Sequence, residues 1–200
     1  MQKTSKKALK IISKKGGIIR TREALEYGIH PRTLYSLRDQ GDLEIISRGL
    51  YKLSSLPPVG DPDLELVAGR IPQGIVCLIS ALAIHELTTQ IPHEVHLAIP
   101  RTARYPVCHE VPIKIYRFSD LAYKSGIIQK EIDGFKVKVY DSEKTLADTF
   151  KYRNKIGLDV FLEALNNYQR RKDSSLQKVL EYAKIDRVSK QIRPYLEATT

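Results

Sequence analysis

Apolar residues near the start of the chain recur at helical spacing and predict a first short helix. Residues 4–15 carry apolar side chains close to one face and lysines elsewhere, which is the pattern of an amphipathic helix. The apolar positions are Ala8, Leu9, Ile11 and Ile12. Gly16 and Gly17 are expected to end this helix, because glycine adopts the left-handed conformation that closes many helices. Ile18 and Ile19 then predict a brief extended segment.

A second short helix is expected from Arg22 to Tyr27. Thr21 is its expected N-cap, because a threonine hydroxyl can accept a hydrogen bond from a free backbone N–H at a helix start. Ala24 and Leu25 are expected to face inward. Gly28 and Ile29 follow as a glycine turn with an apolar residue that points into the core.

A third helix is expected to begin at Pro31 and to end near Gln40, since the fixed φ of proline suits the first helical position. Leu34 and Leu37 lie three residues apart and are expected to face inward. The outward side chains are expected to be His30, Arg32, Thr33, Tyr35 and Ser36. Two short helices joined by a glycine-containing turn predict a helix-turn-helix.

A hairpin is expected directly after the third helix. Leu43–Ser47 and Leu50–Leu53 read as strands, with Arg48 and Gly49 forming the turn between them. A hairpin with a basic tip in this position is a wing. Residues 1–56 are therefore predicted to form a winged helix-turn-helix domain.

A second domain is expected over residues 57–200, after a linker at 54–65 that carries three prolines. Its first half predicts short strands and small helices. The expected segments are a helix at 63–71, a strand at 76–79, a helix capped by Ser80 and running to Leu87, strands at 94–99 and 111–118, and a hairpin of 127–132 and 135–140 around Asp133 and Gly134.

The chain is expected to be helical from about residue 142 onward. Ser142 is the expected cap of a helix that runs to about Tyr152. Apolar stripes at helical spacing then start at Leu158, Leu176 and Val188 and predict core contacts. The predicted fold class is α+β: a winged helix followed by a mixed α/β domain whose C-terminal part is helical.

Positive charge is concentrated in the predicted winged helix. The chain has a net charge of +10, and residues 1–56 hold 12 basic and 5 acidic side chains, a net charge of +7. A local positive field attracts polyanions, with nucleic acid expected first and anionic membrane second. Winged helices also serve as protein-interaction modules, and that alternative stays open at this point.

Candidate DNA contacts follow from groove geometry. The start of the third helix would reach base edges in the major groove, with Arg32 on guanine and Thr33 and Ser36 on bases or phosphates. The start of the second helix would hold phosphate, and the wing tip would contact phosphate or the minor groove. The full candidate set is Arg20, Thr21, Arg22, Arg32, Thr33, Ser36 and Arg48. Lys6, Lys10 and Lys14 would add longer-range attraction.

The sequence carries no recognisable catalytic or metal-binding motif. No Glu-x-Lys sequence, phosphate-binding Walker loop or GxSxG motif is present. Cys77 and Cys108 and the histidines match no standard ligand spacing, so no metal or other cofactor is expected. Neither an apolar run of about 20 residues nor a secretory signal is found, which predicts a reduced, soluble, cytoplasmic protein.

Three stretches together resemble a known family. They are ALEYGIHPRTLYSLRDQGDLEIISRGLYKL at 24–53, SALAIHELTTQIPHEVHLAIP at 80–100 and VYDSEKTLADTFKYRNKIGLDVFLEAL at 139–165. In this order they are similar to the AbiEi-type antitoxins of bacterial type IV toxin–antitoxin systems. These proteins are also described as transcriptional regulators of phage-defence operons, which act by abortive infection.

The resemblance implies two activities and no enzyme. The winged helix would bind inverted repeats in the promoter of its own operon and repress it, as a monomer or weak dimer that binds DNA cooperatively. The C-terminal domain would neutralise a nucleotidyltransferase-like toxin, with or without direct contact. Antitoxicity candidates from the third stretch are Lys144, Asp148, Arg153 and Lys155. A helix-packing and salt-bridge role is an equal alternative for these four.

Two other classes of function remain open from the residues alone. One is a transcription factor with a ligand-sensing C-terminal domain. The other is a nucleic-acid-processing enzyme, which the missing carboxylate motifs disfavour. The cluster of Asp141, Glu143, Lys144 and Asp148 is expected to act as a helix cap, as dipole partners and as surface pairs.

Overall fold

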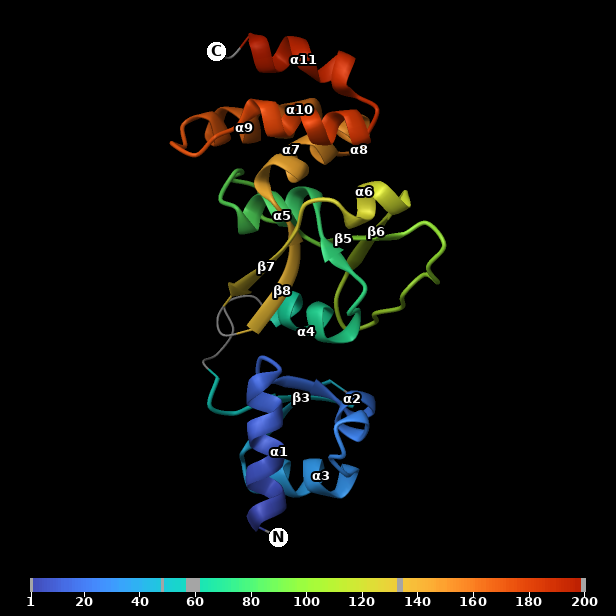
Figure 1. The fold of residues 1–200 in the computed structure, drawn as a ribbon, viewed down its shortest axis with the longest axis vertical. Coiled ribbons are helices and arrows are strands. Elements are labelled where there is room, and N and C mark those ends of the chain that lie inside the picture. The colour runs from blue at the N-terminus through green and yellow to red at the C-terminus, as the bar shows by residue number, and fades with distance from the viewer. Residues whose placement is uncertain (1, 48, 57–61, 133–134, 199–200) are drawn as a thin grey trace. The chain divides into compact units, whose positions relative to one another are not determined.

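The structure is a computed structural model, and it describes residues 2–47, 49–56, 62–132 and 135–198 of the 200-residue chain. These residues fold into two compact units (Figure 1). The first unit draws on residues 1–72 and 130–137, and the second on 73–129 and 138–200. The predicted winged helix, residues 1–56, lies within the first unit. A domain boundary directly after residue 56 stays a prediction.

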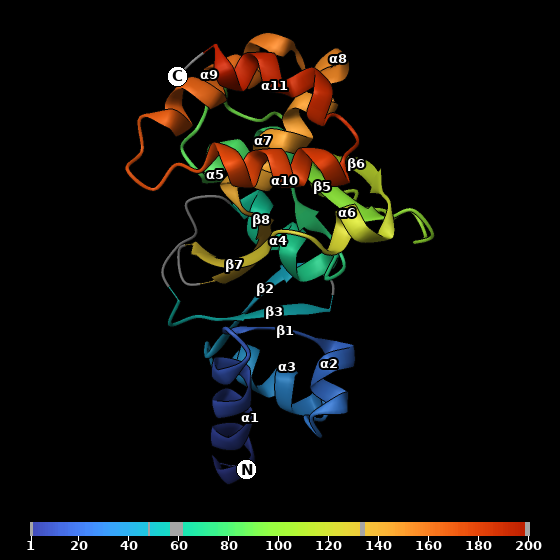
Figure 2. The same cartoon turned by 45° about the horizontal axis from the view of Figure 1, so that its top comes forward.

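The first unit places three helices against a three-stranded sheet (Figure 2). In chain order its elements are α1 Gln2–Lys14, β1 Ile18–Arg20, α2 Thr21–Glu26, α3 Pro31–Asp39, β2 Leu43–Ser47, β3 Leu50–Leu53 and α4 Pro62–Arg70. The strand order is β1-β3-β2 and both pairings are antiparallel, with Tyr51 of β3 opposite Ile19 and Ile45. This is the predicted winged helix-turn-helix arrangement, with α4 added after it.

The core of the first unit forms where the sequence pattern places it. Ile12 of α1, Ile19 of β1 and Leu34 and Leu37 of α3 are at most 1% exposed and belong to one apolar cluster. Apolar burial of this kind supplies most of the stability of short helices, which are marginal in isolation.

Two local predictions for the second helix are wrong. Thr21 is the first residue of α2, and Arg20 is its N-cap, with the backbone N–H of Arg20 donating to the Glu23 carboxylate at 3.1 Å. Leu25 does not face inward, because 53% of its surface is exposed. In a helix of six residues only one narrow face reaches the core, and Ala24 occupies it.

The second unit contains most of a five-stranded mixed sheet and the C-terminal helices. Residues 130–137, which include parts of β7 and β8, group with the first unit. In chain order the elements from residue 73 onward are β4 Ile75–Val76, α5 Leu78–Ile84, β5 Val95–Pro100, β6 Ile113–Phe118, α6 Asp120–Lys124, β7 Ile127–Ile132, β8 Phe135–Tyr140, α7 Ser142–Lys151, α8 Arg153–Ile156, α9 Leu158–Gln169, α10 Leu176–Ile185 and α11 Ser189–Glu197. The strand order is β6-β5-β4-β8-β7. β5 and β6 run parallel, as do β4 and β8, whereas β4 and β5 run antiparallel.

The predicted hairpin strands and the helical C-terminal part agree with the structure, and the predicted α+β fold class is confirmed. Asp133 and Gly134, the predicted hairpin turn, lie outside the described residues. The C-terminal helices share one apolar core, in which the rings of Phe150 and Phe161 meet edge to face at 5.0 Å.

Three predictions in the second unit need correction. The strand expected at 76–79 is only two residues long, because α5 already begins at Leu78. Ser80 is no cap but a buried residue inside α5, where its hydroxyl donates to the Glu94 carbonyl and accepts the N–H of His96. At α7 the cap is Asp141, whose Oδ1 accepts the N–H of Lys144 at 2.7 Å, and Ser142 is the first helical residue.

Candidate nucleic-acid interface

The start of α3 is a capped helix end that carries an exposed arginine. His30 is the N-cap, and its Nδ1 accepts the backbone N–H of Arg32 at 3.2 Å. Pro31 follows at the first helical position, where its missing N–H is no loss. The cap fixes the direction of the helix, so Arg32 projects into solvent from its first turn.

The outer face of α3 holds the other side chains that the sequence assigned to base contacts. Leu34 and Leu37 are fully buried, which turns the opposite side of the helix outward. Thr33 and Ser36 are half-buried, and the Ser36 hydroxyl accepts a hydrogen bond from the side-chain amide of Gln40 at 3.0 Å. Tyr35 is exposed on the same helix.

Arg38 is a cation on α3 that the sequence reasoning left out. Its Nε and Nη2 donate to one carboxylate oxygen of Asp39 at 2.8 and 2.6 Å, and its guanidinium lies 5.5 Å from the centre of the Tyr35 ring. Its place in the last turn of the helix was visible in the sequence. Its pairing with Asp39 partly neutralises it, so it adds less to the positive field than Arg32 does.

Arg22 and Thr21 at the start of α2 differ in what they offer a ligand. The Arg22 side chain is 89% exposed and its only described partner is Glu26 at 3.4 Å, a surface pair of small energetic value. Thr21 instead contacts the wing turn: its N–H and its hydroxyl both donate to the Gly49 carbonyl, at 2.9 and 3.3 Å. Arg22 is therefore free to reach a phosphate, whereas Thr21 fixes the wing to α2.

Arg20 is turned into the first unit rather than toward solvent. Its Nε donates to the Gly69 carbonyl of α4, and its buried Nη2 has no hydrogen-bond partner within the described residues. Burial lowers the pKa of Arg20, opposed by Glu23 and reinforced by the nearby Arg70. The predicted wing-tip contact, Arg48, lies outside the described residues.

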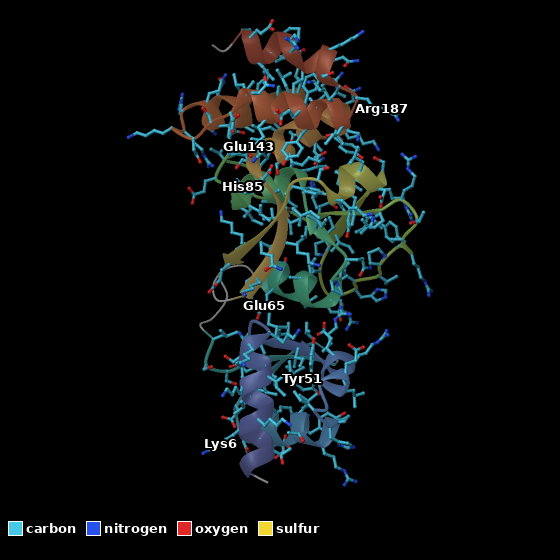
Figure 3. The ribbon with its side chains drawn as sticks, in the orientation of Figure 1. Lys6, Tyr51, Glu65, His85, Glu143 and Arg187 are labelled. Carbon is cyan, nitrogen blue, oxygen red and sulfur yellow. The ribbon has the colours of Figure 1, made fainter. Side chains whose placement is uncertain are left out.

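A lysine stripe extends the positive surface along α1. Lys6, Lys10 and Lys14 are spaced four residues apart and are exposed, and no carboxylate of the described chain pairs with them. Lys6 projects away from the helix in Figure 3. Unpaired cations at this spacing contribute to a field that steers a polyanion.

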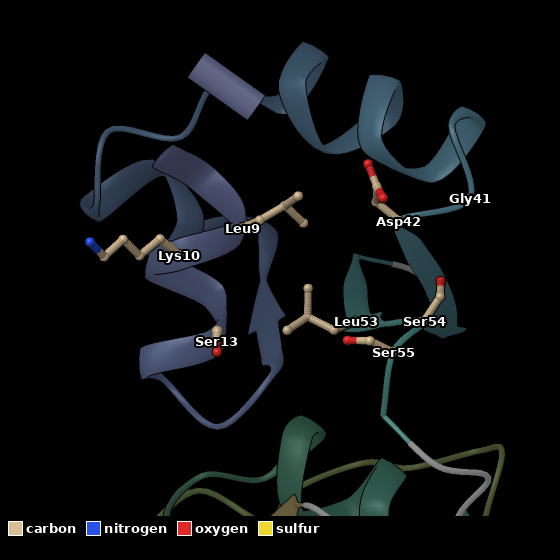
Figure 4. A pocket seen from close by; sticks show the side chains of 8 residues that line it. All are labelled: Leu9, Lys10, Ser13, Gly41, Asp42, Leu53, Ser54 and Ser55. Carbon is tan, nitrogen blue, oxygen red and sulfur yellow. The ribbon is translucent and has the colours of Figure 1, made fainter. Parts of the chain in front are cut away.

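A pocket of about 370 Å³ lies beside α1, and Lys10 of the lysine stripe is one of its lining residues. Leu9 and Leu53 line it with apolar side chains, and Asp42, Ser54 and Ser55 supply polar atoms (Figure 4). The Lys10 ammonium points away from the cavity. The lining contains a single carboxylate and no histidine or cysteine, so it offers no acid–base pair or nucleophile.

The antitoxicity candidates Lys144 and Asp148 are buried. Both side chains are 0% exposed and form an ion pair, and the Lys144 ammonium also lies 3.4 Å from Asp186. The expectation that Lys144 and Asp148 form a surface pair is therefore wrong. Helical spacing of four residues brings them together, but Asp186, 42 residues later in the sequence, closes the network inside the unit.

The other two candidates are more accessible. Arg153 is half-buried, donates to the Phe150 carbonyl at 2.9 Å and stacks over the Phe150 ring. Lys155 is exposed, and the structure gives it no carboxylate partner among the described residues. Of the four candidates, Lys155 is thus the one placed to touch another molecule directly.

The buried carboxyls of this network differ in their tendency to hold a proton. Burial raises the pKa of Asp148 well above its usual range, against the opposing charge of Lys144. Burial also acts on Asp186, but Lys144 and Lys151 outweigh it and hold the pKa of Asp186 below its usual range. Burial therefore favours the neutral form of Asp148, whereas the two lysines favour the charged form of Asp186.

Two other buried titratable groups, Cys77 and His96, have strongly shifted pKa values. Burial raises the pKa of the Cys77 thiol well above its usual range, which makes it a poor nucleophile. Burial lowers the pKa of His96 to about 4, although Glu94 acts in the opposite direction. Among the residues that the structure describes, no three His, Cys, Asp or Glu side chains are grouped as metal ligands, and no helix is long and apolar enough to cross a bilayer.

Comparison with known families bears on the first unit. Residues 6–53 match the family described as "Transcriptional regulator, AbiEi antitoxin". The AbiEi match covers α1 to β3, the three helices and the wing on which the cationic face is built. It confirms the resemblance drawn from the sequence, over this part of the chain. Its description names a regulator and not an enzyme.

Comparisons over the whole chain add little to the AbiEi match. The solved structure described as "Crystal structure of RV2827C protein from Mycobacterium tuberculosis" has a TM-score of 0.44 and 13% sequence identity, and the similarity covers 94% of this chain and 79% of that one. No curated protein matches the sequence.

Proposed function

We propose that the chain is a DNA-binding antitoxin that represses its own operon through the first unit and neutralises a nucleotidyltransferase-like toxin through the second. The observation that carries the proposal is the start of α3. A capped helix end carries the exposed Arg32, which has no ion-pair partner in the described part of the chain, and it lies within the segment that matches a family of transcriptional regulators.

The base sequence of the DNA would be recognised by α3 in the major groove. Side chains at the start of such a helix reach base edges, and an arginine can make two parallel hydrogen bonds to guanine. Arg32 is free for that contact, and Thr33 and Ser36 lie further along the helix within reach of bases or phosphates. Tyr35 offers an exposed ring beside them.

Phosphate contacts would come from elements that flank α3. Arg22 at the start of α2 and the wing tip with Arg48 would hold the two sides of the groove, and the lysines of α1 would add attraction. Arg20 and Thr21 would act indirectly, because Arg20 bonds to α4 and Thr21 to the wing turn. Both thereby set the direction of α2.

Toxin neutralisation would belong to the second unit. Lys144 and Asp148 would act by holding the helices together, since no partner can reach them. Lys155, which is exposed on α8, would contact the toxin directly, and Arg153 would act through its hydrogen bond to the Phe150 carbonyl. We propose no catalytic activity for either unit.

Binding of the full-length protein to duplex DNA from upstream of its own coding sequence tests the proposal. We expect a specific complex whose affinity falls steeply with salt, because released counterions supply much of the binding free energy. Arg32→Ala should weaken this complex by about 5- to 100-fold. Arg193→Ala removes an exposed arginine of α11 that pairs with Glu197 and serves as the matched control. Equal affinities for parent and Arg32→Ala would contradict the proposal.

A further inference from the structure

The second unit carries a basic, aromatic surface loop between β5 and β6 that the proposed function does not use. The segment at 101–109 contains two arginines, one tyrosine and one histidine and no acidic residue. Arg101, Arg104 and Tyr105 are exposed, and Tyr105 has 54% of its surface open to solvent. The first carboxylate is that of Glu110, which accepts the backbone N–H of His109 at 3.1 Å.

The base of this loop is held in place by the sheet. Arg117 of β6 donates from Nη1 to the carbonyls of Arg101 and Ala103, at 2.5 and 3.0 Å, and the Ala103 N–H donates to the Pro100 carbonyl. These bonds fix where Arg101 leaves the end of β5. They leave its guanidinium unpaired, since no carboxylate of the described chain contacts it.

Two further cations lie beside Tyr152 at the junction of α7 and α8, and the Phe118 ring links Tyr152 to the loop base, where the Arg101 N–H donates to the Phe118 carbonyl at 2.9 Å. The ammonium groups of Lys151 and Lys155 lie 5.8 and 5.9 Å from the centre of the Tyr152 ring. Burial raises the pKa of Tyr152 to about 12, and Arg101 acts in the opposite direction, which places its positive charge within electrostatic range of the same tyrosine. Lys151 is paired with Asp186, but Lys155 and Arg101 have no carboxylate partner among the residues that the structure describes.

This cationic group lies at the carboxyl ends of two parallel strands. β5 ends at Pro100 and β6 at Phe118, and the Phe118 ring stacks on Tyr152 at 5.8 Å. Ligand sites in sheets with parallel strands favour this edge, where loops diverge from a rigid frame. The strand pairing therefore holds the backbone of Arg101 beside Phe118, whose ring contacts Tyr152.

The exposed ring of Tyr105 indicates which class of polyanion this surface would bind. It has no ring, hydrogen-bond or ion contact to any described residue. Single-stranded nucleic acids present open base faces that stack on such rings, whereas a duplex covers its base faces and an acidic protein has none.

We propose that the loop at 101–109, together with Lys155, binds a single-stranded nucleic acid, with phosphates on Arg101, Arg104 and Lys155 and a base stacked on Tyr105. This activity is separate from recognition of duplex DNA by the first unit. RNA and single-stranded DNA share the chemistry that is recognised, and the experiment compares them.

Fluorescence anisotropy of the full-length protein with labelled 12-nucleotide oligo(U) and oligo(dT) tests the proposal. We expect Tyr105→Leu to weaken binding at least about fivefold and Tyr105→Phe to retain it, because only the ring is needed for stacking. Arg104→Ala should weaken binding and reduce the salt slope by about 0.7. Arg193→Ala on α11 is the matched control and should bind like the parent. Tighter binding of oligo(U) than of oligo(dT) would assign the site to RNA, and the reverse to DNA.

Two comparisons separate this proposal from the proposed function. Arg32→Ala should lose duplex binding and keep oligonucleotide binding, so the two proposals can fail independently. Polyglutamate of matched charge should not displace the oligonucleotide. Parent-like binding by both Tyr105→Leu and Arg104→Ala would overturn the proposal, as would loss of oligonucleotide binding in Arg32→Ala or full displacement by polyglutamate.

Discussion

Replacement of Lys144 by methionine tests how the buried ion network supports the second unit. Methionine keeps much of the side-chain length and removes the charge. In the parent, the Lys144 ammonium is fully buried, is paired with Asp148 and Asp186, and lies 4.9 Å from the centres of the Phe118 and Tyr140 rings. The substitution removes all of these electrostatic contacts at once.

The expected loss can be bounded from the geometry. At 3.4 Å, and with an effective dielectric constant of about 20, the attraction between Lys144 and Asp186 is about 5 kcal/mol before the cost of desolvation. Removing one member of a buried pair typically costs about 3–5 kcal/mol. Asp186 keeps Lys151 at 2.9 Å, and burial already favours the neutral form of Asp148, so we expect the lower end, about 3 kcal/mol.

Urea unfolding followed by far-UV circular dichroism at pH 7 measures this loss. Lys155→Met is the control, because it removes an exposed lysine from the neighbouring α8 and should change the free energy of unfolding by less than about 0.5 kcal/mol. If Lys144→Met costs no more than Lys155→Met, the network does not stabilise the fold and the reasoning is refuted.

Five further substitutions, at four positions, give predictions of known sign. Asp148→Asn should gain stability relative to the parent as pH rises from 5 to 8. The raised pKa of Asp148 gives the parent stability that is fully present below the unfolded pKa of 3.8 and is lost as pH rises through the folded pKa, whereas asparagine does not titrate. Urea unfolding at both pH values measures the difference. Gly126→Ala should destabilise by at least about 2 kcal/mol, since φ is +72° and a Cβ would meet that of Lys144 at 2.7 Å. Gly41→Ala, with φ +79° and open space, should cost only about 1–2 kcal/mol in the same assay. His30→Ala should cost about 1 kcal/mol by loss of the cap and His30→Asn should restore it, as thermal unfolding can measure.

The winged helix was accessible from the sequence because its signals are local. Apolar spacing in α1 and α3, proline at the start of α3 and glycines after the helices each act within a few residues. The family match over 6–53 agrees with that prediction. The cationic face follows from the same periodicity, since burial of Leu34 and Leu37 determines which side chains point outward.

What the sequence could not provide depends on distant contacts. Lys144 and Asp148 have the spacing of a surface pair, and only the contact with Asp186 on a later helix shows that they lie in the core. Arg20 has the charge and the helix-start position expected of a phosphate contact. Its guanidinium instead donates a hydrogen bond to the carbonyl of Gly69, 49 residues away in the sequence. Local pattern does not contain either partner.

Neighbouring residues of similar chemistry caused the smaller errors. Asp141 and Ser142 are both residue types that favour the N-cap position. The strand ends at Tyr140, and the next residue, Asp141, is the N-cap of α7. The run from Val76 to Ile79 is apolar throughout and fits a buried strand or a buried helix equally well. Cys77 is still extended and serves as the N-cap, and the helix begins at the next residue, Leu78.

The central claim is that side chains at the start of α3 contact base edges in the major groove of DNA. The base preference of the Arg32→Ala variant tests this claim most directly. Affinities of parent and variant would be measured against a set of upstream duplexes, each with one base pair changed. We predict that the parent discriminates at one G·C pair by about 5- to 100-fold and that the variant loses this discrimination while keeping it elsewhere. Unchanged preferences at every position, or uniform weakening across all duplexes, would contradict the claim.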